Sequence, residues 1–178
     1  MLNPVKSKIG SLTLVFIYYV ISFYLAYIFT KTINLNDWPL LLVWHITATF
    51  IIFFFSKIHN NSSIYDPFWH VAPIPIVFYI ASNSSLSNLQ QGLVLSAFLF
   101  WALRLTYNWF LNWTNLDHED FRYIDLKNNN KLLAFVNDLF GIHLIPTLIV
   151  NASLYPIYIA LTSENLNNLI YVGFILII

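Results

Sequence analysis

The sequence predicts an all-α protein, a polytopic bundle of transmembrane helices. Hydrophobic residues make up 58% of the 178 residues and charged residues only 9%, proportions outside the range of ordinary soluble domains. The mean hydropathy is +0.67. Several apolar stretches reach the ~20 residues that a helix needs to cross a bilayer. Together these observations make the lipid bilayer the first expected partner of the chain.

The first two predicted spans, residues 9–30 and 38–56, are uninterrupted. The first follows two lysines, as a secretory signal does, but its apolar stretch is too long for a signal and lacks a small-residue cleavage site. We therefore expect it to remain as a membrane helix. The next stretch, residues 70–82, is short and contains Pro73 and Pro75, which favours a kinked span over a re-entrant segment.

The second half of the chain predicts further spans. Residues 92–113 form a full span, whereas residues 132–162 are too long for one. We expect an interfacial or pocket-lining helix there, leading into a span from about Ile142. A final apolar run starts near Leu169 and is cut off at Ile178. The prediction is therefore a single domain with about five to six spans, the last of them truncated.

Basic residues predict the orientation. If the spans alternate, Lys31 falls on one side of the membrane and six cations fall on the other: Lys6, Lys8, Lys57, Arg122, Lys127 and Lys131. The positive-inside rule makes the richer side cytoplasmic, and the N-terminus with it. The expected membrane is the endoplasmic reticulum for a eukaryotic source and the inner membrane for a bacterial one.

Several function classes are excluded. The net charge is zero, and the scattered cations form no basic face for nucleic acid. The chain has no cysteine, so thiolate metal sites and cysteine nucleophiles are ruled out. It also lacks GxGxxG, GxxxxGK[ST] and GxSxG patterns, which excludes the Rossmann site, the P-loop and the esterase elbow. Any nucleotide must therefore bind among helices.

The span at residues 92–113 carries a polar stripe. Trp101, Arg104, Asn108 and Asn112 recur at helical spacing, with Tyr107 beside them. Arg104 is roughly 14 Å from the cytoplasmic end of the span, where a charge is costly and usually marks a functional site. We expect the stripe to line a binding pocket.

A structural role for Arg104 is the alternative, because the guanidinium can pair with Asp138 or Asp66 to hold helices together. The loop that follows the span is dense in charge: Asp117, His118, Glu119, Asp120, Arg122 and Tyr123. No two-ligand metal spacing occurs there, so no metal site is expected. The loop is either a solvated segment or a cover over a polar ligand, with Glu119 and Asp120 accepting and Arg122 donating to an anion.

A third polar feature, NNSSIYDPFWHVAPIPI, meets the membrane through Tyr65, Asp66 and Trp69. Asp66 can accept from a hydroxyl or amine, Tyr65 can donate to a carbonyl, and His70 titrates near neutrality. We expect Tyr65 and Asp66 to act in catalysis at the mouth of a cavity. A turn with an interfacial aromatic anchor is the structural alternative.

The segments SIYDPFW, WALRLTYNW, LDHEDFRY and FGIHLIP, in this order, resemble an uncharacterised branch of the steroid 5-alpha-reductase superfamily, over residues 60–161. The resemblance implies an all-helical enzyme that uses NADPH to reduce a carbon-carbon double bond conjugated to a carbonyl in a lipid or steroid-like substrate. It implies a cytoplasmic cofactor site, with these candidate cofactor contacts: Arg104, Asn108, Glu119, Asp120, Arg122 and Tyr123. The candidate catalytic residues are Tyr65, Asp66 and Tyr107, with Tyr107 as the proton donor.

The family's RHPNY-like segment does not occur before Ile178. We therefore expect residues 1–178 to be the N-terminal part of a longer reductase-like bundle that lacks the C-terminal cofactor motif. Two alternatives remain open. One is a membrane methyltransferase of the isoprenylcysteine or phospholipid type, and the other is a non-catalytic integral membrane protein.

Overall fold

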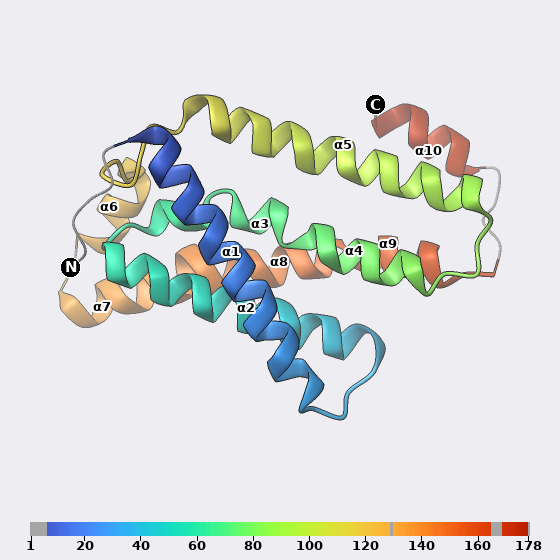
Figure 1. Cartoon of the computed structure of the whole chain (residues 1–178), viewed down its shortest axis with the longest axis horizontal. Coiled ribbons are helices and arrows are strands. Elements are labelled where there is room, and N and C mark those ends of the chain that lie inside the picture. The colour runs from blue at the N-terminus through green and yellow to red at the C-terminus, as the bar shows by residue number, and fades with distance from the viewer. Residues whose placement is uncertain (1–6, 129, 165–168, 178) are drawn as a thin grey trace.

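A computed structural model describes residues 7–128, 130–164 and 169–177 (Figure 1). Helices form all the regular structure in these ranges, which confirms the predicted all-α class. The elements are α1 (Lys8–Lys31), α2 (Asp37–His59), η1 (Ser62–Tyr65), α3 (Phe68–Val71), α4 (Pro73–Ser82), α5 (Asn88–Asn112), α6 (Phe121–Lys127), α7 (Lys131–Val136), η2 (Asn137–Leu144), α8 (Ile145–Ser153), α9 (Tyr155–Thr162) and α10 (Leu169–Ile177).

Four helical stretches in the described ranges are long and apolar enough to cross a membrane: α1, α2, α5 and the continuous stretch Lys131–Thr162. This corrects the expected five to six spans. The segment with Pro73 divides into the short helices α3 and α4, and the described part of α10 has nine residues. Residues 131–162 form one helical stretch with a π-helical turn, η2, rather than two helices that divide near Ile142.

The turns of the chain gather at two ends of the bundle (Figure 1). The start of α1, residues 60–67, residues 113–120 and α6 meet at one end, which we call the α6 end. Residues 32–36 and 83–87 lie away from it. Polar side chains at the α6 end cap the helix starts, since Ser7 accepts from the Gly10 N–H and Asp120 accepts from the Arg122 N–H.

The apolar core has two parts. The first joins α1, α2, η1 and α3 around Tyr19, Ile52 and Phe68. The second joins α4, α5 and α9 around Val77 and Phe98. The first part includes residues of α3 and the second includes residues of α4, so the short proline-broken segment connects the two parts of the core.

A line of buried polar side chains runs along η2 and α8: Asp138, His143, Thr147 and Asn151. Their spacing of five and then four residues follows from the wider π turn, which keeps all four on one side of the helix. The line faces α2, where Ser56 approaches His143 Nε2 at 3.2 Å and Thr49 lies 2.9 Å from Thr147. These contacts pair polar groups that a membrane interior leaves without water.

Candidate functional site

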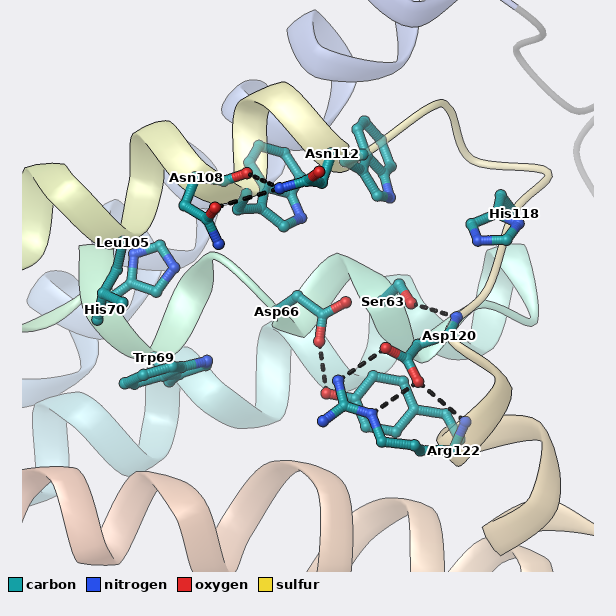
Figure 2. Close-up of a pocket in the computed structure, with 13 residues that line it drawn as sticks. Ser63, Asp66, Trp69, His70, Leu105, Asn108, Asn112, His118, Asp120 and Arg122 are labelled. Carbon is teal, nitrogen blue, oxygen red and sulfur yellow. Dashed lines mark hydrogen bonds and ion pairs between the residues drawn. The ribbon is translucent and has the colours of Figure 1, made fainter.

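A cavity of about 410 Å³ opens at the α6 end, between α3, the C-terminal part of α5 and α6 (Figure 2). Its walls combine indole rings, amides and charged groups from segments distant in sequence. The lining residues are Ser63, Asp66, Trp69, His70, Leu105, Asn108, Trp109, Asn112, Trp113, His118, Asp120, Arg122 and Tyr123.

The loop before α3 is held in place by the loop before α6. The Asn61 amide donates to the carbonyls of Leu116 and His118, at 2.7 and 3.1 Å. The Ser62 N–H donates to Glu119 Oε1, and the Asp120 N–H donates to Ser63 Oγ at 2.9 Å. Because backbone and side-chain groups of each loop form hydrogen bonds with the other loop, the two loops together form one wall of the cavity.

Asp66 and Tyr123 meet at the base of this wall. The Tyr123 hydroxyl donates to Asp66 Oδ1 across 2.5 Å. Burial raises the pKa of Asp66 to about 6, against the opposing effect of hydrogen bonds from Tyr123 and Ser63. Burial and the charge of Asp66 also raise the pKa of Tyr123. At neutral pH the ionised Asp66 carboxylate therefore accepts from a protonated Tyr123 next to an open cavity, and Asp66 takes up a proton near pH 6.

Arg122 forms a two-point ion pair with Asp120. Its Nε and Nη2 donate to the two carboxylate oxygens at 2.8 and 2.7 Å (Figure 2). The hydrogen bond from Arg122 lowers the pKa of Asp120, and the same bond raises the pKa of Arg122. Both groups are therefore charged at neutral pH, and the pair is neutral as a unit.

Two tryptophans, Trp109 of α5 and Trp113 in the loop after it, line the cavity with their rings. Trp109 and Trp113 stack at a centroid distance of 4.9 Å, and their indole N–H groups are buried without a partner among the described residues. An unsatisfied buried N–H costs about 1–3 kcal/mol.

The cavity offers more carboxylates than cations. Asp66 and Asp120 line it, whereas Arg122 is the only Lys or Arg in the described lining and is already paired. Proteins bind phosphate through free cations or arrays of backbone N–H groups. The lining therefore fits an uncharged polar group such as a carbonyl or amide, and does not fit the phosphates of a dinucleotide. No cluster of three metal-binding side chains occurs in the described ranges.

Comparison with known proteins assigns the chain to a family. Residues 52–178 match the family described as "Protein of unknown function (DUF1295)". The chain belongs to this family. DUF1295 is associated with steroid 5-alpha-reductase-like membrane proteins, which confirms the resemblance at that coarser level. No curated protein and no solved structure matches the chain.

Five of the residues predicted as site residues of this DUF1295 chain line the cavity: Asp66, Asn108, Asp120, Arg122 and Tyr123. Two others lie beside it. Tyr65 is buried beneath the loop and lies 2.8 Å from the Thr147 hydroxyl. Glu119 accepts from Ser62 and pairs with Lys127, so its carboxylate holds the two loops together.

Arg104 and Tyr107 lie outside the cavity, which corrects their predicted grouping with Asn108. Successive helix residues turn by roughly 100°, so Arg104 and Tyr107 point roughly 100° and 160° away from Leu105, which faces the cavity. Both side chains are exposed, and Tyr107 is 63% exposed. Arg104 pairs with neither Asp66 nor Asp138, because Asp66 bonds to Tyr123 and Asp138 pairs with Lys57.

Sequence reasoning missed the tryptophan wall and the loop contacts. Asn61, Ser62 and Ser63 read as an ordinary polar turn, yet all three are buried and hydrogen-bonded to the second loop. The signal in the sequence that could have indicated these contacts is this run of small polar residues close to Asp66. Trp109 and Trp113 are four residues apart, a spacing that places them on one helix face.

Proposed function

We propose that this chain is part of a membrane-embedded NADPH-dependent reductase of a conjugated carbon-carbon double bond in a lipid or steroid-like substrate. The observation that carries the proposal is the pair of Tyr123 and Asp66, joined across 2.5 Å in the wall of the cavity. The association of DUF1295 with steroid 5-alpha-reductase-like membrane proteins is the basis for the reaction class in this proposal.

The reduction needs a hydride at the β carbon, for which NADPH is the source, and a group that stabilises the negative charge growing on the carbonyl oxygen. Tyr123 suits this second role, because its hydroxyl is already oriented by Asp66 and can donate to a substrate oxygen instead. Asp66, with a pKa of about 6, can then take up a proton from solvent and pass it to the Tyr123 oxygen. We assign the residues that line the cavity to binding of the carbonyl end of the substrate. We assign none of the described residues to binding of the NADPH phosphates.

The test uses the purified full-length protein in phosphatidylcholine vesicles with NADPH and a long-chain enone, and it follows NADPH oxidation by absorbance. Activity should fall about 10²-fold in Tyr123→Phe, the scale of one lost proton-transfer group. Tyr24→Phe, an exposed tyrosine distant from the cavity lining, should leave it unchanged. Wild-type protein that consumes no NADPH would refute the proposal. A loss in Tyr107→Phe but not in Tyr123→Phe would restore the assignment made from sequence.

A methyltransferase is the second candidate, favoured by the excess of carboxylates and aromatic rings over cations in the cavity. A sulfonium cation, such as that of S-adenosylmethionine, is stabilised by carboxylates and by ring faces. Asp66, Asp120, Trp69 and Tyr123 line the cavity that would receive it. The methyltransferase would be favoured if S-adenosylmethionine binds saturably, if Asp66→Asn weakens this binding, and if the protein does not reduce the enone.

We further propose that the α6 end faces the cytoplasm. Lys8, Lys57, Arg122, Lys127 and Lys131 belong to the elements that meet there, whereas Lys31 ends α1 away from it (Figure 1). The predicted contribution of Lys6 lies outside the described residues. Cytoplasmic loops of membrane proteins carry such an excess of cations, and the cavity would then open toward the NADPH pool.

A further inference from the structure

His70 reaches the cavity from α3 and is held by a hydrogen bond to α5. The residue is 2% exposed and belongs to the cavity lining, so the described residues already enclose most of its ring. Its Nδ1 lies 3.0 Å from the Thr106 hydroxyl oxygen. Figure 2 shows His70 and Asn108 on the side of the cavity away from Asp120 and Arg122. His70 therefore belongs to a part of the cavity that the Asp120–Arg122 ion pair does not occupy.

The Thr106 hydroxyl determines which imidazole nitrogen of His70 carries the hydrogen. This hydroxyl donates its single hydrogen to the Ala102 carbonyl at 2.8 Å, so it can only accept from His70 Nδ1. Burial lowers the pKa of His70 to about 4, so the ring is neutral at pH 7 and does not titrate near neutrality as the sequence suggested. A neutral imidazole with its hydrogen on Nδ1 has an acceptor lone pair on Nε2. No hydrogen bond joins this Nε2 to another group in the part of the chain that the structure describes.

Asn108 brings a hydrogen-bond donor to the same part of the cavity. The Asn112 amide donates to Asn108 Oδ1 at 3.2 Å and to the Asn108 carbonyl at 2.8 Å, which fixes the orientation of the Asn108 amide. Figure 2 shows the Asn108 amide nitrogen pointing toward the space between α5 and α3. The wall therefore presents one acceptor, His70 Nε2, and one donor, Asn108 Nδ2. A hydroxyl group complements both, because it donates one hydrogen bond and accepts another.

We propose that the substrate of this cavity carries a hydroxyl group in addition to its conjugated carbonyl. His70 Nε2 accepts from this hydroxyl and Asn108 Nδ2 donates to it, whereas Tyr123 donates to the carbonyl oxygen, an assignment that rests on the proposed function. The ring of Trp69, at a centroid distance of 5.0 Å from the His70 ring, gives the carbon skeleton next to the hydroxyl an apolar surface. An ether or ester oxygen at this position would face the His70 lone pair without a hydrogen between them. The site should therefore discriminate against such compounds.

The test compares the binding of alcohols and of their methyl ethers to the purified full-length protein in phosphatidylcholine vesicles without NADPH. The probes are long-chain enones with the hydroxyl placed at successive carbons beyond the double bond, each paired with its methyl ether. Binding is followed by the quenching of tryptophan fluorescence, because Trp69, Trp109 and Trp113 line the cavity, and affinities refer to the ligand concentration in the bilayer. The best alcohol should bind about tenfold more tightly than its ether, the scale of one net hydrogen bond.

Four variants locate the origin of this preference. His70→Phe should remove the preference and leave the affinity for the ether at or above the wild-type level, which shows that the variant still folds. Its matched control, His118→Phe, changes an exposed histidine of the same cavity lining and should keep the preference. Asn108→Leu should weaken alcohol and ether alike, because both oxygens accept from its amide. Thr106→Val frees the ring to place its hydrogen on Nε2, so the ether should gain affinity and the preference should narrow.

Equal binding of every alcohol and its ether to wild type would overturn the inference, as would a preference that persists in His70→Phe. If His70→Phe binds neither ligand, a narrowed preference in Thr106→Val supports the inference and an undiminished one overturns it. Because these measurements need no NADPH, their result is separate from that of the reductase assay. Enone reduction with equal binding of alcohol and ether would refute the hydroxyl site alone. A preference for the alcohol without NADPH oxidation would refute the reductase alone.

Discussion

The Tyr123 hydroxyl donates a hydrogen bond of 2.5 Å to Asp66 Oδ1, and this contact joins α6 to the loop that precedes α3. The two residues are 57 positions apart in the sequence. They come together because Asn61, Ser62 and Ser63 bind the segment before α6. The candidate site is therefore a product of loop packing at one end of the bundle.

The raised pKa of Asp66 predicts a pH dependence of stability. Its pKa is about 6 in the folded protein and 3.8 as the ordinary value, so between these values the folded state binds more protons than the unfolded state. Stability should therefore fall as pH rises from about 4 to 6 and level off above. Asp66→Asn should remove this loss of about 3 kcal/mol, measured by thermal unfolding in detergent across this pH range.

Tyr123→Phe provides the control for that experiment, because it removes a hydrogen bond that lowers the pKa of Asp66. The pH window of the stability loss should then extend above 6. A wild-type stability curve parallel to that of Asp66→Asn between pH 4 and 6 would show that Asp66 titrates normally.

Glu119 should control the loop before α6. Glu119 Oε1 accepts from the Ser62 N–H and from Lys127 Nζ, both at 2.5 Å, and these groups are largely buried. In Glu119→Ala the Ser62 amide loses its acceptor, so its hydrogen exchange should rise about tenfold, as expected for one lost bond. The neighbouring Asp117→Ala, at an exposed position, should leave exchange unchanged. Similar exchange in both variants would contradict this role.

Asp138 should be a main stabilising residue of the bundle. Its carboxylate is 1% exposed and accepts from Lys57 Nζ at 3.0 Å and from Ser62 Oγ at 2.7 Å. The Lys57 side chain is 39% exposed, but the Ser62 hydroxyl is buried and would lose its acceptor, which costs about 1–3 kcal/mol. Asp138→Ala should therefore lower the melting temperature in detergent by several degrees. Asp125→Ala, at an exposed position of α6, should change it little. Equal melting temperatures for the two variants would show that the Lys57 pair is dispensable.

The orientation is open to direct labelling, because the chain contains no cysteine. Asp117→Cys, in the loop at the α6 end, should react with an impermeant thiol reagent only from the cytoplasmic side. Asn34→Cys, in the exposed turn between α1 and α2, should react only from the other side. The reverse pattern would place the cavity on the opposite face of the membrane.

The sequence by itself determined the membrane class, the helical content and the positions of the polar turns. Those features depend on local hydropathy and on breaks such as Pro73, and both can be read along the chain. The sequence also indicated Asp66, Asp120, Arg122 and Tyr123 as candidate site residues, and the structure brings these four together around one cavity.

Only the tertiary structure decided which side of each helix faces inward. Arg104 and Asn108 read as one stripe, yet α5 is rotated so that Asn108 lines the cavity and Arg104 faces outward. The physical reason is that lipid tails are as apolar as a protein core, so the hydrophobic pattern of a membrane helix does not mark its packed side. Specific contacts set that rotation instead, such as the 3.0 Å approach of Thr106 in α5 to His70 in α3.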